Sequence, residues 1–381
     1  MHVVHSFVFH LLYLFIFHPQ FIYADVHIAD WDHDHHHTHS ENWKGTCTAG
    51  KKQSPIDIES NKTIKEKWGQ PFVFHGYEKP VPMHVKNNQH SIVVEYLDHE
   101  NHHKDTWIRG GGLGESKFSF AQLHFHWGST NDQGSEHTID GKAAPMEMHI
   151  VHWNLDVGKD VKEATQKDSY NSFEVLAVLF KIGKRNLKYE GFFNAAKKVV
   201  RQNTNSTLEK GGRLKDLLPA DTNVFYRYKG SLTTPPCNEI VMWSIFKDPV
   251  EVSQEQIDIL RKAYYHKEGE TEPRGISNNY RSTQNVNERE VLEVDTHIFH
   301  LDCAIKGSAR YKVSDDPKGF KAKSDRLIQK DIENRSDSIT KSFKSLLFVS
   351  FYICYLLSIS YIYTWIQTFF VYRYIKVYDD N

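Results

Sequence analysis

The sequence predicts one large β-rich domain with further segments at both ends of the chain. A length of 381 residues accommodates such a domain, and 39% hydrophobic and 13% aromatic residues are typical of a chain with a buried core. Residues 122–127 and 147–153 alternate polar and apolar side chains with the period of a strand, and residues 173–180 form an apolar run typical of a buried strand. We therefore expect strands to carry the most informative positions.

The first of these segments reads Gln-Leu-His-Phe-His-Trp over residues 122–127. Successive side chains of a strand point to opposite faces, so His124 and His126 share one face. The second segment, residues 147–153, contributes His149 in the same way. If the two strands are neighbours in one sheet, the three imidazoles converge on one point.

Three neutral imidazoles with one open position are the ligand set of a catalytic zinc. A metal-bound histidine usually donates its second ring N–H to an acceptor, and Gln122 and Glu147 stand on the ligand face, two positions before a ligand. Ordinary core or surface histidines are the alternative. A His-x-His pair alone would leave that alternative open, but the third histidine and the two acceptors favour the zinc site.

Five further segments, in chain order, give the sequence a family resemblance. They read Gln-Ser-Pro-Ile-Asp at 53–57, Asn-Gln-His at 88–90, Ser-Glu-His-Thr-Ile-Asp at 135–140, Ser-Leu-Thr-Thr-Pro-Pro at 231–236 and Asn-Tyr-Arg at 279–281. Together with the histidine segments they resemble the motifs of the α-class carbonic anhydrases, of the extracellular, membrane-anchored type. The resemblance covers most of the chain, from residue 31 to residue 295.

The resemblance implies a β-rich α+β fold with a large, twisted, mostly antiparallel central sheet, short peripheral helices and zinc at the base of a conical cavity. It also implies the activity of a carbonate dehydratase, a hydro-lyase. That activity is the reversible hydration of carbon dioxide to bicarbonate and a proton by a zinc-bound hydroxide. Zinc can lower the pKa of its bound water to about 7, and carbonic anhydrase is itself the usual example of this effect.

By resemblance, Thr233 accepts a hydrogen bond from the hydroxide and donates its own proton to Glu136. A hydroxyl has a single proton, so its donation to a carboxylate obliges the hydroxide to be the other donor. Thr234 is implied to position bicarbonate, although both threonines also fit a turn before Pro235. His90 stands where the family places its proton shuttle, a role that suits an imidazole of ordinary pKa.

Further site residues follow from the resemblance. Five apolar residues match the family's carbon dioxide wall, although sequence alone would assign them to the core: Val151, Val178, Leu232, Val241 and Trp243. Asn88 belongs to the shuttle segment. We expect His137 to make a buried hydrogen bond near Glu147 and Tyr228. Strand alternation points His152 away from the ligand face.

Cysteines and glycosylation sequons agree with export from the cell. Secreted family members join cysteines at places that match Cys47 and Cys237, so the resemblance implies a disulfide between them that would brace the loop carrying Thr233. Given export, three acceptor sequons are candidates for glycosylation: Asn61, Asn205 and Asn334.

The N-terminal segments precede the domain. Residues 1–24 resemble a secretory signal peptide, with an uncleaved anchor as the alternative. Residues 25–45 are rich in histidine and predict a solvated, flexible arm, with loose metal binding as the alternative. The catalytic domain itself is expected to span residues 31–298.

The C-terminal segments predict attachment to a membrane. Residues 299–344 form a polar, lysine-rich linker, and residues 345–372 have no charged side chain, which predicts a membrane span. Residues 373–381 would form a short tail. A single-pass protein of the cell surface, with its catalytic domain outside, is the first interpretation. A glycolipid anchor is the alternative, because small residues, a polar spacer and a hydrophobic tail also occur in that order.

The charge balance bears on the partners of the chain. With 47 basic and 48 acidic residues, the formal net charge is −1, so no positive excess suggests a nucleic acid. The expected partners are carbon dioxide, bicarbonate and the membrane, and the sequence leaves protein partners open. A catalytically silent family member that serves as a binding or adhesion ectodomain is the rival hypothesis. Retention of all three ligand histidines favours the enzyme.

Overall fold

The computed structural model describes residues 43–66, 70–98, 102, 104–208, 211–266 and 271–297. The chain divides into two compact units, residues 1–309 and 310–381, and every described residue belongs to the first. The predicted signal peptide, linker, membrane segment and tail lie outside the described residues, as does Asn334. None of the described helices is long and apolar enough to cross a membrane.

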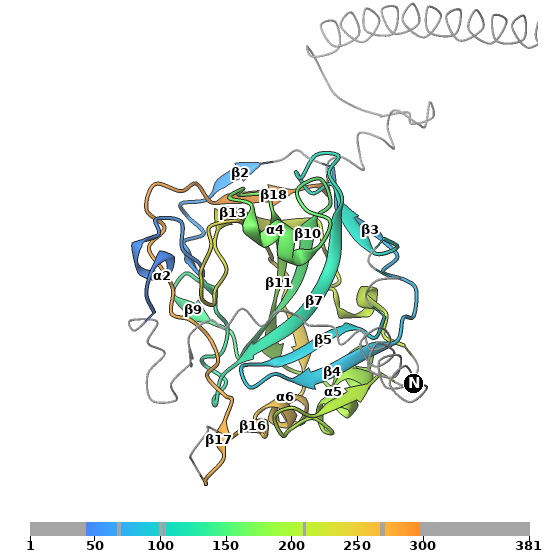
Figure 1. The fold of residues 1–381 in the computed structure, drawn as a ribbon. Helices are drawn as coiled ribbons and strands as arrows, with labels where there is room; N and C mark the ends of the chain where they lie inside the picture. The colour runs from blue at the N-terminus through green and yellow to red at the C-terminus, as the bar shows by residue number, and fades with distance from the viewer. Residues whose placement is uncertain are drawn as a thin grey trace, which may run out of the picture. The chain divides into compact units, whose positions relative to one another are not determined.

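A sheet of 13 strands dominates the described part of the domain (Figure 1). Its strands are β2 (Ile64–Glu66), β3 (Val73–His75), β4 (Met83–Asn87), β5 (Ile92–Tyr96), β6 (Trp107–Arg109), β7 (Phe118–Trp127), β10 (Met146–Asn154), β11 (Phe173–Ile182), β12 (Asn205–Thr207), β13 (Val224–Gly230), β14 (Val241–Phe246), β15 (Val250–Val252) and β18 (Leu292–Asp295). The main path runs β12-β4-β5-β7-β10-β11-β14-β13-β18-β2, with β6 beside β7 and β3, and β15 beside β11. Most neighbours are antiparallel, and β11–β14, β11–β15 and β18–β2 are parallel.

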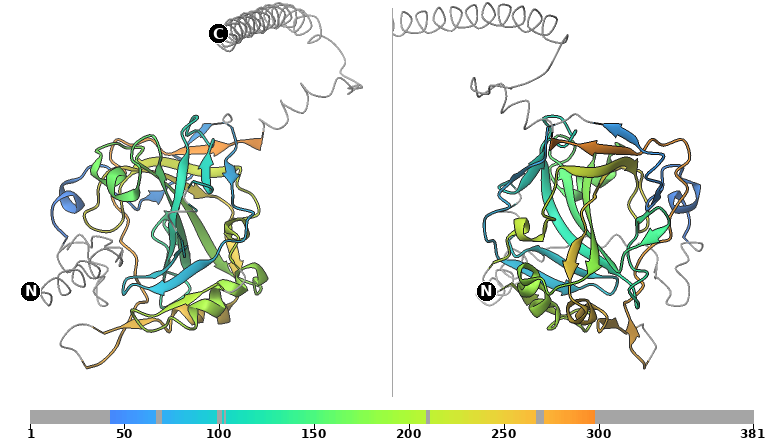
Figure 2. Two further views of the ribbon diagram at one scale, coloured as in Figure 1. Left: turned by 45° about the vertical axis from the view of Figure 1, so that its right-hand side comes forward. Right: turned by 180° about the vertical axis from the view of Figure 1, so that it is seen from behind.

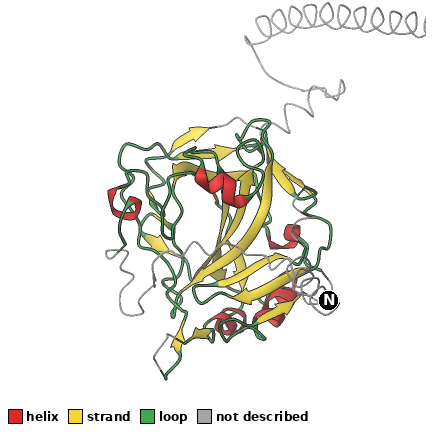
Figure 3. Ribbon diagram, in the orientation of Figure 1, coloured by secondary structure: helices red, strands yellow, loops and turns green. Residues whose placement is uncertain are grey.

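Smaller elements surround this sheet. A three-stranded sheet contains β1 (Asp57–Ile58), β8 (Thr138–Ile139) and β9 (Lys142–Ala143), and β16 (Tyr264–Tyr265) pairs with β17 (Arg274–Gly275). The helices are α2 (Thr46–Ala49), α4 (Val161–Gln166), α5 (Glu190–Ala196), α6 (Gln254–Leu260) and the 3₁₀ turns η2 (Leu187–Tyr189) and η3 (Leu214–Leu217). Figure 3 shows these short helices at the periphery, and both views of Figure 2 show the long strands running through the domain. The β-rich, mostly antiparallel fold implied by the resemblance is confirmed.

The two histidine segments are neighbours, as the sequence predicts. β7 and β10 pair antiparallel, with His124 opposite His149 and His126 opposite Glu147. Directly opposite residues of a pair present their side chains on the same face, so the register places all three histidines on one face. A bulge between Val151 and His152 then interrupts the pairing.

Two apolar clusters cover the two faces of these strands. The far-side core includes Leu123, Phe125, Met148, Ile150, Leu176 and Val178, and it also contains Phe192 and Phe193 of α5. The ligand-side core includes Ala121, Val175, Ala177, Val241 and Trp243. Because side chains alternate along β7 and β10, His124, His126 and His149 all face the ligand-side core.

Candidate metal centre

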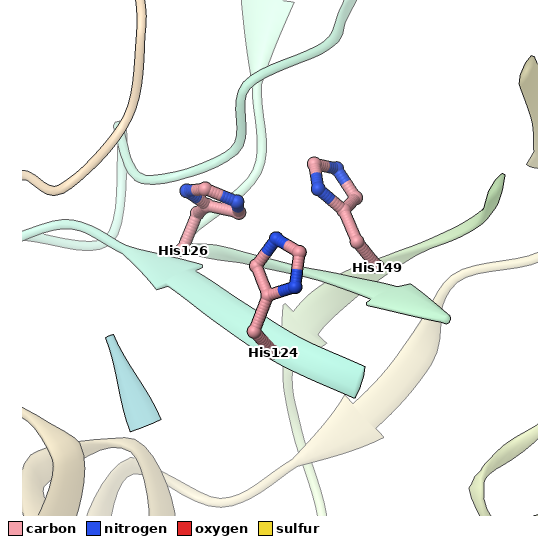
Figure 4. Close-up of side chains that lie close together, drawn as sticks. All are labelled: His124, His126 and His149. Atoms are coloured by element: carbon pink, nitrogen blue, oxygen red, sulfur yellow. The ribbon is translucent and has the colours of Figure 1, made fainter. Parts of the chain in front are cut away.

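Three histidine rings converge on one point. Figure 4 shows His124 and His126, from β7, turned toward His149, from β10. One nitrogen of each ring lies within 4.8 Å of the corresponding nitrogens of the other two. His126 and His149 are buried and His124 is half-buried, so the shared point lies inside the protein and His124 is the histidine nearest to solvent.

The other nitrogen of each ring is held by an acceptor. Nδ1 of His124 lies 3.0 Å from Oε1 of Gln122. Nε2 of His149 lies 2.7 Å from Oε1 of Glu147. Both acceptors are the ones that the sequence predicts, and they fix the orientation of the rings as expected for metal ligands.

The acceptor for the third ring was not apparent from the sequence. Nδ1 of His126 lies 2.6 Å from the backbone oxygen of Asn279. Asn279 comes from the Asn-Tyr-Arg segment, 153 positions away along the chain. A backbone carbonyl has no residue signature, so only the quoted segment itself could have drawn attention to this position.

The nitrogens left at the convergence point fit a metal ion. Nε2 of His126 is buried and has no hydrogen-bond partner among the described residues, which is costly unless a cation binds there. Burial lowers the pKa of His126, and burial together with the neighbouring histidines lowers that of His124 well below its usual value. Neutral imidazoles are the form that binds metal.

A buried hydrogen-bond network supports the ligand His149. Oε1 of Glu147 also lies 2.7 Å from Nδ1 of His137, while its Oε2 accepts from the backbone N–H groups of Glu136 and His137. Burial alone would raise the pKa of Glu147, but His137 and His149 outweigh it and hold that pKa well below its usual range. Nε2 of His137 lies 2.7 Å from the Tyr228 hydroxyl, as predicted from the sequence.

Similarity to known proteins identifies the family. The family model of eukaryotic-type carbonic anhydrases matches residues 34–295. The chain belongs to this family. Carbonic anhydrase 4 of Rattus norvegicus is 35% identical over 256 residues, which are 66% of this chain and 78% of that protein. Carbonic anhydrase 12 of Homo sapiens is 38% identical over 242 residues, which are 62% of this chain and 65% of that protein.

A third relative, the putative carbonic anhydrase 3 of Caenorhabditis elegans, is 34% identical over 246 residues, 64% of this chain and 91% of that protein. Carbonic anhydrases are lyases that hydrate carbon dioxide and use zinc, so the enzyme class and the cofactor predicted from the sequence are confirmed. The residues that would hold the zinc in this carbonic anhydrase are His124, His126 and His149.

Glu136 lies beside the histidines of the candidate metal centre. Its Oε1 accepts from the backbone N–H of Arg281 at 2.8 Å. Its Oε2 is buried, lies 3.5 Å from Nε2 of His126, and has no hydrogen-bond partner in the described part of the chain. The hydrogen bond from Thr233 that the resemblance implies is therefore not formed in this structure, and the role of Thr233 stays a prediction.

The loop that carries Thr233 is tied to the N-terminal part of the domain. The predicted disulfide between Cys47 and Cys237 is present, with the two Cα atoms 5.0 Å apart. Ser54 and Ser231 exchange two hydrogen bonds, each backbone N–H donating to the other residue's hydroxyl. Ser54 was not predicted from the sequence to contact this loop, although it lies in the Gln-Ser-Pro-Ile-Asp segment at 53–57.

Four of the five predicted wall residues line the ligand side. Val241 and Trp243 belong to the ligand-side core, and Val151 and Leu232 pack against it. The Trp243 ring lies edge-on to that of His149, with centroids 4.7 Å apart. The conical cavity implied by the resemblance stays a prediction.

The prediction for the fifth wall residue, Val178, was wrong. Val178 pairs with Met148 and lies in the far-side core, on the face opposite the ligands. Val175 pairs with Val151 and belongs to the ligand-side core instead. The two valines are three positions apart, an odd step that reverses the face of a strand.

His90 lies in a tight turn between β4 and β5. Oδ1 of Asn88 accepts from the backbone N–H groups of His90 at 3.1 Å and Ser91 at 2.8 Å. Asn88 is exposed and His90 is half-buried. The Asn88 side chain therefore shapes the turn, and the proton-shuttle role of His90 stays a prediction.

Proposed function

We propose that this carbonic anhydrase hydrates carbon dioxide with zinc held by His124, His126 and His149, and that Thr233, Glu136 and His90 supply orientation and proton transfer. One observation carries the proposal: each of three clustered histidines has one nitrogen held by an acceptor and the other directed to a shared point. When bound there, zinc acidifies a water molecule so that it becomes a nucleophile near neutral pH.

Glu136 and Thr233 would orient the attacking water. Oε1 of Glu136 already accepts from the Arg281 backbone, so Oε2 is the oxygen left to accept from the Thr233 hydroxyl. Once Thr233 has donated its only proton, it can only accept from the water. A lone pair of the water oxygen would then point toward carbon dioxide, while Thr234 would position the bicarbonate product.

The apolar wall would hold carbon dioxide, a small molecule without a net dipole. Trp243 and Val241 are buried, and Val151 and Leu232 are half-buried at the edge of the same cluster. The aliphatic side chains have no hydrogen-bonding groups, and the indole N–H of Trp243 already donates to the Ser231 carbonyl at 3.0 Å. The wall therefore offers water no hydrogen bond in competition with the substrate. We add Val175 to this wall in place of Val178, because it shares the cluster with Trp243.

His90 would carry the released proton to the solvent. The turn that holds it lies next to β5, and Val93 of β5 pairs with the ligand His124. An imidazole of ordinary pKa accepts and releases protons near neutral pH, which a shuttle requires.

We also propose that the enzyme works outside the cell. Disulfides persist in oxidising compartments, so the Cys47–Cys237 bond supports export. The sequon residues Asn61 and Asn205 are both exposed, as glycosylation requires. The segment 345–372 would anchor the protein in the membrane, with a glycolipid anchor as the alternative.

Stopped-flow measurement of carbon dioxide hydration tests the proposal. We expect rapid hydration by the zinc-loaded protein and a lower kcat in His90→Ala that imidazole buffer restores. His75→Ala is the matched control, because His75 is an exposed histidine on β3, and its rate should be unchanged. Background rates with zinc loaded would instead indicate a silent binding module, and a defect that imidazole leaves uncorrected would refute the shuttle.

A further inference from the structure

We propose that Asn279 is a positioning residue: its carboxamide, helped by the Ser91 hydroxyl, holds the turn that carries His90 against the zinc-ligand strand. We call residues 87–91 the shuttle turn. The inference rests on the proposed role of His90, and it concerns the side chain of Asn279 rather than the backbone carbonyl that faces His126.

The Asn279 side chain bonds the turn and the ligand strand at once. Its Nδ2 donates to the backbone oxygen of His90 at 2.8 Å and to that of Phe125 at 3.0 Å. Its Oδ1 accepts from the backbone N–H of Trp127 at 2.9 Å. Asn279 is only 2% exposed, so these bonds are shielded from water and both amide protons are used.

Side chains hold the turn here because the backbone ladder between β5 and β7 has ended. The pairing covers Val94 with Leu123 and Val93 with His124. At the next position of β7, the Ser91 hydroxyl takes over: it accepts from the Phe125 N–H at 3.1 Å and donates to the Phe125 oxygen at 2.6 Å. The Phe125 carbonyl therefore accepts from both Ser91 and Asn279.

This arrangement links the shuttle turn to the metal centre. Phe125 is flanked in sequence by the ligands His124 and His126. The Asn279 carbonyl accepts a hydrogen bond from Nδ1 of His126. The side chain of one residue thus fixes the turn while its backbone fixes a ligand. A substitution of the side chain retains the backbone carbonyl that faces His126, and Ser91→Ala loosens the turn without changing Asn279, so the two functions can be separated by experiment.

The test compares kcat with kcat/KM in the zinc-loaded, full-length protein. In the proposed reaction His90 carries the proton away after bicarbonate has left the site, so this transfer enters kcat and not kcat/KM. We expect Asn279→Ala to lower kcat about tenfold through displacement of a catalytic group, to leave kcat/KM within about twofold, and to regain its rate in imidazole buffer. Ser91→Ala should show the same pattern more weakly, and it remains informative if Asn279→Ala does not fold.

Two further variants complete the design. Tyr280→Phe is the matched control, because it removes a hydrogen bond of the same segment, from the Tyr280 hydroxyl to Gln133, and should change neither constant. The double variant His90→Ala, Asn279→Ala should turn over no more slowly than His90→Ala alone, since a turn without its shuttle has nothing to position.

Three results would overturn the inference, and they are distinguishable. If His90→Ala has normal kcat, the shuttle assignment fails and the positioning role fails with it. If His90→Ala is slow and rescued but Asn279→Ala and Ser91→Ala are normal, only the positioning role fails. If Asn279→Ala loses zinc and kcat/KM together and Ser91→Ala is normal, Asn279 acts on the ligand strand alone.

Discussion

Two buried polar clusters occupy opposite faces of the same strands, and only one of them can hold a metal. On the ligand side, His149 keeps one nitrogen on Glu147 and presents the other to the shared point. On the far side, His152 is equally buried, but its Nε2 lies 2.5 Å from the Tyr77 hydroxyl and its Nδ1 lies 3.3 Å from the Glu174 carbonyl. Burial in a strand therefore does not by itself make a histidine a metal ligand. A ligand also needs a ring nitrogen that no other hydrogen bond occupies, which His149 has and His152 lacks.

The carboxylates of the two clusters differ in the same way. Glu147 accepts hydrogen bonds from two histidine rings and two backbone N–H groups, and its pKa lies well below the usual range despite burial. Glu174 is paired with Arg227 at 3.3 Å, and its Oε2 has no partner among the residues that the structure describes. Burial raises the pKa of Glu174 to about 7, against the opposing effects of Arg227 and Ser244. In Glu147 the two histidines outweigh burial, whereas in Glu174 Arg227 and Ser244 do not.

The largest expected effect is a difference in zinc binding and hydration rate between variants of His124 and of His152. His124→Ala should lose zinc and with it the hydration rate, by on the order of 10⁴-fold or more, because the ligand set is broken. His152→Ala should keep both, and its free energy of unfolding should fall by about 1–3 kcal/mol as the Tyr77 hydroxyl and Glu174 carbonyl lose a partner. Zinc content, stopped-flow rates and thermal unfolding measure all three quantities. Loss of zinc from the His152 variant would contradict the comparison.

The next effect concerns Oε2 of Glu136 and Oε2 of Glu174, which are buried on opposite faces and have no hydrogen-bond partner among the described residues. If Oε2 of Glu136 accepts from Thr233 during the reaction, Thr233→Ala should lower kcat/KM about 100-fold, as loss of a positioned hydrogen-bonding group typically does. Thr233→Ser retains the hydroxyl and should recover most of the rate. Glu174→Gln changes the other oxygen and should leave kcat/KM unaltered. Equal rates for Thr233→Ala and the unmodified enzyme would exclude the proposed orientation.

A smaller effect is expected on zinc affinity. Glu147→Gln replaces the charged acceptor of His149 by a neutral one and should weaken zinc binding about 10- to 100-fold. Glu174→Gln makes the same substitution on the far side and should not alter the affinity. Competition with a chelator measures both dissociation constants, and comparable weakening in the two variants would show that the clusters are not independent.

These comparisons show what the sequence could and could not predict. Polar–apolar alternation placed His124, His126 and His149 on one face, because a period of two is visible in a single strand. The same reasoning cannot assign faces in the run 173–180, because apart from Glu174 the residues on both faces are apolar. There the resemblance led to Val178 instead of Val175. The Cys47–Cys237 bond depended wholly on the resemblance, since pairing across 190 positions leaves no local signal.

Contacts made by backbone groups were also beyond the sequence. The Asn279 carbonyl that accepts from His126 and the His90 carbonyl that accepts from Asn279 have no residue-specific sequence pattern.

One side-chain pair was equally hard to predict. The far-side pair of Glu174 and Arg227 joins β11 to β13, which are separated by β14 in the sheet. Such partners are set by register and sheet order, which only the folded chain defines.

The smallest effect follows from Glu174 and is a dependence of stability on pH. Its pKa is about 7 in the folded protein against an ordinary value of 4.5, so the folded state binds more protons than the unfolded state between these limits. The free energy of unfolding must then fall as pH rises through that window: the contribution of Glu174 is complete below about pH 4.5 and is lost by pH values above about 7.

Glu174→Gln removes this titration, while other titrating groups, including the zinc ligands, are common to both proteins and cancel in the difference. We expect the stability of the unmodified protein relative to the variant to decline by roughly 2 kcal/mol between about pH 5 and pH 8, because the folded-state pKa of about 7 already includes the attraction of Arg227. Denaturant unfolding of both proteins at several pH values, with the disulfide intact, measures it. A relative stability that rises with pH would mean that Arg227 outweighs burial, and the far-side carboxylate would then resemble Glu147 after all.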